Sequence, residues 1–273
     1  MIHVKAREPG NKTMMQTRAP MPLPDPIQKT AVSANIEAQT GAASAPGLGV
    51  PVALPKYLEQ TYWWAYLHPR GVSFFERQWL VNLILWGNYG ALRDAVFREL
   101  PSAGASRILQ VACVYGDFTA KLAQHLGPSA RLDIVDVAPV QLENLRRKVG
   151  RRAGVHLHHQ DSGNLAFPDQ SYDFVVVFFL LHEQPEQARS RTVAEALRVA
   201  RRGGKVIFVD YHRPARSNPL RYVMRPILGK LEPYALDMWS TEIVSWLPAQ
   251  IRRSRVEKNV YFGGLYQRVV VTL

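Results

Sequence analysis

The sequence lacks the features that mark secreted and membrane-spanning proteins. It contains a single cysteine, Cys113, so no disulfide can form within the chain, and a reducing compartment is indicated. No stretch reaches the roughly 18 consecutive apolar residues that a membrane-spanning helix needs. We therefore expect any contact with a bilayer to be peripheral.

Aromatic residues are missing from residues 1–55, which are rich in Pro, Ala, Gly and Gln. This segment has too little apolar periodicity to fold alone, so we predict a disordered, flexible tail. Its excess of basic residues raises the alternative of an organelle transit peptide. Serine is absent from the first thirty residues and amphipathicity is poor, which disfavours that alternative.

Acidic residues are scarce relative to basic ones: 22 Asp and Glu face 34 Lys and Arg, for a net charge of +12. Such a charge indicates an acidic partner, which could be nucleic acid, anionic lipid or an acidic protein. The 273 residues, 47% of them hydrophobic, suffice for one full α/β core with extensions.

Residues 56–100 hold four of the six tryptophans and read as two or three helices, broken at 68–71 and 87–88. Most of these aromatic side chains are expected to pack the helices onto the core. Some could instead line an apolar pocket or lie at a lipid interface, because Trp and Tyr suit a boundary with one wet side.

Residues 101–273 alternate between predicted strands and helices, which favours a parallel sheet. The last two predicted strands are separated only by Gly263 and Gly264, a hairpin signal that makes the final strand antiparallel. A seven-stranded, mostly parallel sheet with one reversed strand follows. The predicted strands are 107–112, 132–137, 155–159, 174–180, 205–210, 256–262 and 265–272, and the predicted helices are 118–126, 139–149 and 187–200.

The stretch RILQVACVYGDFTAKLA, residues 107–123, reads as a strand, a tight turn at Gly116 and a helix. The next predicted strand ends in Asp136, and a carboxylate at that place can accept both hydroxyls of a ribose. The pattern indicates a nucleotide-like ligand.

Several motifs at matching spacing give the chain a family resemblance: IVDVAPVQLENLRRK, QDSGNLAFPDQSYDFVVVFFLLHEQP and EALRVARRGGKVIFVDYHRP. Across about residues 107–214 they resemble the class I S-adenosylmethionine (SAM)-dependent methyltransferases, and in particular the quinone-biosynthesis C-methyltransferases. The resemblance implies a Rossmann-like α/β fold and SAM as cofactor, with the N-terminal aromatic helices added to it.

The first loop departs from that family, which usually carries an acid and three alternating glycines there. This chain has Gln110, Ala112, Val114 and Gly116 instead. The bulkier residues should reshape the part of the site that holds the methionine half of SAM. The loss of the acid removes a carboxylate that would help hold the ligand's ammonium group.

Together with the aromatic segment, ACVYGDF resembles the rhodoquinone biosynthesis family, from Tyr57 to the C-terminus. That resemblance implies conversion of ubiquinone to rhodoquinone by replacement of a ring methoxy group with an amino group, with SAM as amino donor and Mn²⁺ as a possible helper. The cofactor-binding residues it implies are Val114, Tyr115, Gly116, Asp117, Asp136, Val137, Asp161 and Ser162. Asp161 could instead cap a turn, and Asp117 could simply begin a helix.

Polar residues follow the fourth and fifth predicted strands, where ligands bind in open α/β sheets. We predict that His182, Glu183, Asp210 and His212 face one crevice and could hold Mn²⁺ or Mg²⁺. His182 and His212 are also candidate general bases, and with Tyr115 they are the predicted catalytic residues. Each could equally cap a helix or bond to backbone.

Residues 213–252 are longer than a simple connection and are predicted to form a lid whose helix is kinked or divided at Pro226. Five basic residues precede any acid there. We expect a cytoplasmic protein whose lid and aromatic segment dock peripherally on the anionic surface of the inner membrane, where ubiquinone is found.

Two other functions stay open. The chain could be an ordinary C- or O-methyltransferase of a quinone or lipid, or a non-catalytic scaffold of the same fold that has lost ligand binding. A nucleic-acid methyltransferase fits the charge, but the apolar flanks and the lack of a nucleic-acid module weigh against it.

Overall fold

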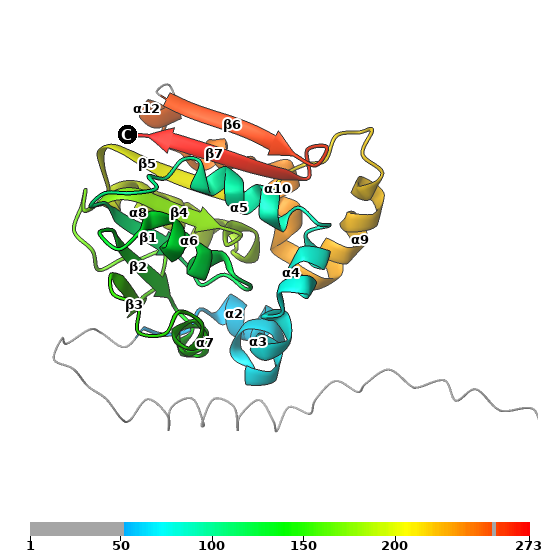
Figure 1. Ribbon diagram of the computed structural model, residues 1–273. Helices are drawn as coiled ribbons and strands as arrows, with labels where there is room; N and C mark the ends of the chain where they lie inside the picture. The colour runs from blue at the N-terminus through cyan, green and yellow to red at the C-terminus, as the bar shows by residue number, and fades with distance from the viewer. Residues whose placement is uncertain (1–51, 253–254) are drawn as a thin grey trace, which may run out of the picture. The chain divides into compact units, whose positions relative to one another are not determined.

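A seven-stranded β-sheet forms the centre of the described part of the chain (Figure 1). The computed structural model describes residues 52–252 and 255–273, so residues 1–51 of the predicted tail lie outside the described residues. The strand order is β3-β2-β1-β4-β5-β7-β6, and only β7 runs against its neighbours. The predicted sheet, including its reversed last strand, is confirmed.

The strands lie close to their predicted positions, because each is a short apolar run bounded by turn residues. The exception is β5, which begins at Ala200 rather than 205, where it pairs with Tyr172 across a register shift. The strands are β1 (Arg107–Val111), β2 (Arg131–Asp136), β3 (Val155–His159), β4 (Tyr172–Phe178), β5 (Ala200–Tyr211), β6 (Arg255–Tyr261) and β7 (Tyr266–Thr272).

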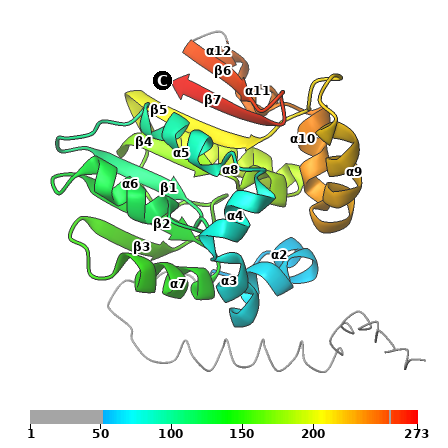
Figure 2. The same ribbon diagram turned by 45° about the vertical axis from the view of Figure 1, so that its right-hand side comes forward.

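Helices cover both faces of the sheet (Figures 1 and 2). The helices α5 (Tyr89–Phe97) and α6 (Phe118–Leu126) lie on one face, and α8 (Glu186–Val199) lies on the other. The helix α7 (Pro139–Val149) follows β2. A single hydrophobic core joins these helices to the sheet, so the carboxyl ends of the strands are held rigidly.

The aromatic segment forms more helical pieces than predicted: α2 (Lys56–Thr61), the π-helix η1 (Trp63–Leu67), α3 (Pro69–Phe75) and α4 (Gln78–Ile84) all precede α5. The predicted break at 68–71 is confirmed only at His68, which caps α3, because residues 69–71 already form the first turn of that helix. The break at 87–88 is confirmed by Gly87, whose φ of 77° ends the helical run.

The predicted lid, residues 213–252, begins with an irregular stretch and is a series of helices from Leu220 onward. Its first helix, α9 (Leu220–Leu231), is not divided at Pro226. Pro226 lies on the exposed side, where water can satisfy the carbonyl that lacks a donor. The lid continues through η3 (Pro233–Leu236), α10 (Asp237–Ser240), α11 (Ile243–Trp246) and α12 (Ala249–Arg252).

Among residues 52–252 and 255–273, no helix has both the length and the apolar character needed to cross a membrane.

Candidate active site

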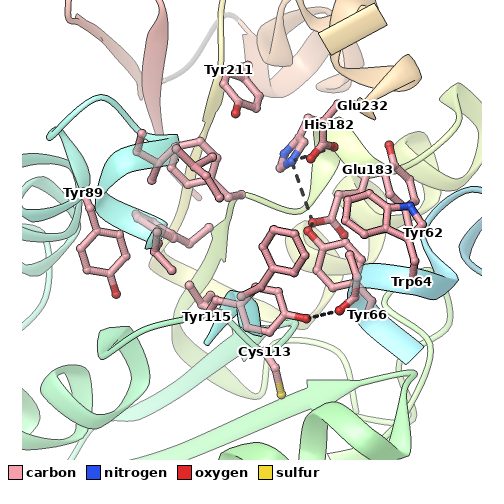
Figure 3. Close-up of a pocket in the computed structure, with 18 residues that line it drawn as sticks. Tyr62, Trp64, Tyr66, Tyr89, Cys113, Tyr115, His182, Glu183, Tyr211 and Glu232 are labelled. Carbon is pink, nitrogen blue, oxygen red and sulfur yellow. Dashed lines mark hydrogen bonds and ion pairs between the residues drawn. The ribbon is translucent and has the colours of Figure 1, made fainter. Parts of the chain in front are cut away.

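Two adjoining cavities open at the carboxyl ends of β1, β2 and β4. One, the polar cavity, is lined by Asp136, Asp161, Ser162 and Gln184 and has a free volume of about 600 Å³. The other, the aromatic cavity, has about 810 Å³ including its mouth, and its walls include Tyr62, Tyr66, Phe75, Tyr89, Phe178, Phe179 and Tyr211 (Figure 3).

The two cavities share part of their walls. Tyr66, Cys113, Phe179 and Glu183 line both of them. A ligand in the polar cavity therefore lies next to a ligand in the aromatic cavity, with only these side chains beside the junction. This arrangement suits transfer of a group from one bound molecule to another.

Asp136 lies in the polar cavity, as predicted. Its Oδ2 accepts a hydrogen bond from the backbone nitrogen of Cys113 at 2.7 Å, and its Oδ1 accepts one from that of Ala138 at 2.8 Å. Burial raises the pKa of this carboxyl, and the two backbone donors oppose the rise. Each carboxylate oxygen can accept a second bond, so Asp136 can still hold a pair of hydroxyl groups.

Asp161, Ser162 and Gln184 also line the polar cavity. Gln184 Nε2 donates to Ser162 Oγ at 3.0 Å, while its buried Oε1 has no hydrogen-bond partner among the described residues. Asp161 Oδ1 accepts from the backbone nitrogen of Gly163, so the predicted turn-capping role is also present. An unpaired acceptor in a buried cavity is a site for a ligand's N–H or O–H group.

Two residues in the cavity walls have left-handed backbone conformations that glycine would adopt more easily. Ala112, after β1, has a φ of 72°, and Phe179, after β4, has a φ of 52°. Both are held by backbone hydrogen bonds to neighbouring strands, to Val135 and Val209 respectively. Such strain persists only where the surroundings fix it, and it gathers at functional sites.

Tyr115 belongs to the aromatic cavity rather than to the polar one. Its ring stacks on Tyr66 with centroids 5.5 Å apart, and its hydroxyl donates to the Ala65 carbonyl oxygen and accepts from Gln141 Nε2. With its hydroxyl engaged on both sides, Tyr115 forms a fixed wall. Its one proton is donated to a backbone carbonyl and one lone pair of the hydroxyl is left, so its predicted catalytic role stays a prediction.

A buried cluster of acids surrounds His182 at the end of the aromatic cavity (Figure 3). His182 Nδ1 lies 2.9 Å from Asp210 Oδ1, and its Nε2 lies 3.6 Å from Glu232 Oε2 and 3.9 Å from Glu183 Oε1. The Tyr66 hydroxyl donates to Glu183 Oε1.

These groups shift one another's pKa. Burial alone would lower the pKa of His182, but the carboxylates of Asp210, Glu232 and Glu183 outweigh it and raise the pKa to about 9. Burial raises the pKa of Glu183 to about 8, although His182 opposes the rise. Burial also raises the pKa of Glu232. At neutral pH the cluster thus holds a protonated imidazole and a protonated Glu183, both able to give a proton.

Three of the four predicted metal ligands, His182, Glu183 and Asp210, are brought together, and the fourth is not. His212 lies apart from His182: its Nδ1 is 2.7 Å from the Gly264 carbonyl oxygen and its Nε2 is 3.0 Å from Lys258 Nζ. Asp210 uses its oxygens on the backbone nitrogens of Leu181, His182 and Tyr211. Within residues 52–252 and 255–273, no group of three or more His, Cys, Asp or Glu side chains is placed to hold a metal ion. The predicted Mn²⁺ site is therefore not assembled.

The rest of the predicted cofactor set divides between the cavities. Val137 lines the polar cavity and Val114 the aromatic one. Gly116 and Asp117 lie outside both, because their backbone nitrogens donate to Glu76 Oε1 and Gln78 Oε1 at the junction of α3 and α4. The expectation that these two line the methionine part of the ligand is not met by this arrangement.

Gln110, which replaces the family's acid, is fully buried and engaged. Its Nε2 donates to the Ala112 carbonyl oxygen at 2.9 Å and its Oε1 accepts from Thr119 Oγ1 at 3.0 Å. The side chain therefore contributes neither a charge nor a free hydrogen-bonding group to either cavity.

Sequence reasoning missed four polar residues of the site. Tyr62 and Tyr66 were counted only among the aromatic side chains, and Gln184 lies within a matched motif without an assigned role. Glu232 could have been singled out from the sequence, because it is the first acidic residue after the basic stretch of the lid. The other three carry no pattern that separates them from ordinary core residues.

Comparisons with known proteins agree with this geometry. A methyltransferase-domain family model matches residues 108–204. The chain is 29% identical over 161 residues to the demethylmenaquinone methyltransferase of Staphylococcus saprophyticus, covering 56% of this chain and 67% of the relative. It is 28% identical over 159 residues to that of Staphylococcus aureus, covering 56% and 65%. The chain thus spans about two thirds of the length of these relatives.

A solved structure supports the fold. The SAM-dependent methyltransferase of Thermotoga maritima described as a possible histamine N-methyltransferase superposes with a TM-score of 0.54 at 18% identity, covering 77% of this chain and 99% of that one. The strand order and the antiparallel β7 are those of class I methyltransferases. The chain therefore has the fold of the class I methyltransferases, matches a methyltransferase domain over residues 108–204, and is distantly similar to the demethylmenaquinone methyltransferases.

Proposed function

We propose that the protein transfers a group from SAM to the ring of a lipid-soluble quinone. The observation that carries the proposal is the pair of cavities with a common wall: a polar one with acceptors for an adenosyl group, and an apolar, aromatic one that ends in a protonated histidine. When bound, SAM supplies an activated methyl group and a primary amine.

The residues of the polar cavity fit SAM. The free lone pairs of Asp136 suit ribose hydroxyls, and the unpaired Oε1 of Gln184 suits the amino group of an adenine. Asp161 and Ser162 lie beside Gln184 and complete a polar wall on that side.

The residues of the aromatic cavity fit a quinone ring. Tyr66, Phe179 and Tyr211 offer ring faces for stacking, and the cavity also contains the polar side chains of Tyr62 and Glu232, which interact with each other. Protonated His182 would donate to a quinone carbonyl oxygen and make the ring more electrophilic. Glu183, at the common wall, would pass a proton between the cavities.

Transfer of the methyl group to a ring carbon is the first candidate reaction. It is supported by the distant relatives, which are named demethylmenaquinone methyltransferases. For this reaction the reduced ring must lose a proton. Glu183, at the common wall, would accept it in its ionised form, which its raised pKa of about 8 favours at mildly alkaline pH.

Transfer of the amino group is the second candidate. The amine nitrogen of SAM adds to a ring carbon, the methoxy group leaves as methanol with a proton from the nitrogen, and the bond from the nitrogen to the cofactor's α-carbon is then cleaved by elimination, with a proton moving from the cofactor's β-carbon to the nitrogen. This candidate is supported by Gln110, because the buried amide places no negative charge where the family's acid would stabilise an ammonium ion. His182 and Glu183, both protonated near neutral pH, add no negative charge either. Such surroundings favour the neutral, nucleophilic form of an amine.

The test is a pair of incubations, each followed by the mass of the quinone product. Ubiquinone, whose ring carbons are all substituted, is incubated with SAM labelled in the amino nitrogen, and a reduced quinone that keeps a free ring C–H is incubated with SAM labelled in the methyl carbon. Carbon label in the product supports methyl transfer, and nitrogen label supports amination. If calorimetry shows no SAM binding and neither label is transferred, the protein is instead a non-catalytic member of the fold.

A further inference from the structure

Large apolar side chains are exposed mainly on two segments of the chain. Within the described residues, eight of the twelve exposed large hydrophobic side chains lie on residues 79–86 or on α9. Trp79 is 59% exposed, Leu83 63% and Tyr222 74%. The eight are Trp79, Leu83, Ile84, Trp86, Tyr222, Val223, Ile227 and Leu231. Apolar exposure on this scale marks an interaction surface.

The two segments adjoin and form one surface, here named the α4–α9 face and defined by those eight residues. Trp86 Nε1, just after α4, lies 3.1 Å from Met224 Sδ on α9. Both ribbon views show α4 and α9 as neighbours (Figures 1 and 2). On α9, Val223, Ile227 and Leu231 are spaced four residues apart and therefore follow one side of the helix.

The α4–α9 face is continuous with the mouth of the aromatic cavity. Ile84 is 42% exposed and also lines the cavity, as does Trp64, which is 37% exposed. Val81 and Leu85, from the same residues 79–86, also line the aromatic cavity. An apolar route therefore runs from the surface to the cavity that ends at His182.

The charge around the face is of one sign. Residues 77–93 contain no acid, and residues 213–231 contain five basic residues and no acid. The first acid after them, Glu232, is directed inward, with Oε2 3.6 Å from His182 Nε2. Aromatic and aliphatic side chains flanked by Arg and Lys are the chemistry that an anionic lipid surface recognises.

We propose that the α4–α9 face docks on an anionic membrane leaflet and delivers a lipid-soluble substrate past Ile84 and Trp64 into the aromatic cavity. The docking proposal is argued only from the residues of the α4–α9 face, whereas the delivery step rests on the proposed function. In this arrangement the hydrocarbon tail of the substrate stays in the leaflet while its ring enters the protein.

Docking is tested by sedimentation of the full chain with vesicles of phosphatidylglycerol and phosphatidylcholine at low salt. Trp79→Ser/Leu83→Ser removes apolar anchors that touch neither cavity, and Arg221→Glu/Arg225→Glu reverses two charges on α9. Each double variant should weaken vesicle binding about tenfold or more. The matched control Arg151→Glu/Arg152→Glu reverses the same number of exposed charges after α7 and should bind as the parent does.

The docking proposal is overturned if the parent does not sediment with these vesicles, or if Trp79→Ser/Leu83→Ser binds them as tightly as the parent. It is also overturned if the parent forms a dimer that Trp79→Ser/Leu83→Ser abolishes while vesicle binding is unaffected. In that case the face joins two copies of the chain.

Delivery is tested with two substrates. Trp79→Ser/Leu83→Ser should lose turnover of a long-tailed quinone in vesicles about tenfold and keep turnover of a short-tailed, water-soluble quinone. Equal loss on both substrates overturns delivery. If the parent turns over neither quinone yet sediments with vesicles, the proposed function fails and docking stands.

Discussion

Glu232, in the lid, places its Oε2 3.6 Å from Nε2 of His182, which follows β4 at the edge of the sheet where ligands bind. The contact joins the lid to the segment that follows β4, and both side chains line the aromatic cavity. The position of the lid and the protonation of His182 are therefore coupled.

Glu232→Gln should lower the pKa of His182, because it removes one of the carboxylates that raise it. The imidazole then loses its proton at a lower pH, so the alkaline limb of the rate profile should move down by about one pH unit, equivalent to roughly 1.4 kcal/mol. The measurement is kcat against pH. The control Glu242→Gln, at an exposed ion pair with Lys258, should leave the profile in place; an unshifted profile in Glu232→Gln contradicts the coupling.

Stability should fall as pH rises. The pKa of Glu183 is raised from 4.5 to about 8, so between those values the folded state holds a proton that the unfolded state has released. The same holds for His182 between 6.5 and about 9. The free energy of unfolding should thus fall by up to about 1.4 kcal/mol per pH unit for each group inside its window.

Glu183→Gln should remove the Glu183 part of that slope. Denaturant unfolding between pH 5 and pH 8 should show a flatter dependence in the variant than in the parent, because glutamine does not titrate. A variant that loses stability with pH as steeply as the parent would show that the Glu183 pKa is not raised by the fold.

Asp136→Asn should weaken SAM binding about tenfold to hundredfold, the range expected when one charged hydrogen-bond acceptor is lost. Calorimetry measures the affinity, and a thermal unfolding curve checks that the fold survives. The control Asp169→Asn changes an exposed acid paired with Arg198 outside both cavities and should bind normally. Undiminished affinity in Asp136→Asn would place the ribose elsewhere.

The variant Tyr115→Phe distinguishes a structural role of Tyr115 in the cavity wall from a catalytic role of its hydroxyl. The variant keeps the stacked ring but loses the hydroxyl that joins Ala65 to Gln141, which should cost about 1–3 kcal/mol in the free energy of unfolding. We expect kcat to change less than threefold at a temperature where the variant is folded. A kcat loss of a hundredfold or more in the folded variant would restore the catalytic role predicted from the sequence.

The sheet could be predicted from sequence because its strands are apolar runs of regular spacing, and Gly263–Gly264 identified the reversed strand. Asp136 and Asp161 followed from a family pattern placed on those strands. The sequence could not show that His212 turns toward Lys258 rather than toward His182, because side-chain direction after a strand depends on packing with β6 and β7.

Prediction from the sequence was limited in a similar way for the lid. Its helix was predicted from apolar spacing, yet the inward turn of Glu232 depends on how α9 ends against η3 and the residues after β4. Likewise, Glu76 and Gln78 at the α3–α4 junction accept hydrogen bonds from the loop after β1. No local sequence pattern predicts this contact. Residues brought together from distant segments were the ones that sequence reasoning missed.

The most direct measurement is the mass of the quinone recovered after the protein, presented on anionic vesicles, acts on two substrates with labelled SAM. Ubiquinone is paired with label in the amino nitrogen, and a reduced quinone with a free ring C–H is paired with label in the methyl carbon. The account predicts that one of the two labels enters the quinone, and that Glu232→Gln slows its entry. Recovery of unlabelled quinone from both incubations, with SAM bound in the polar cavity, would contradict it.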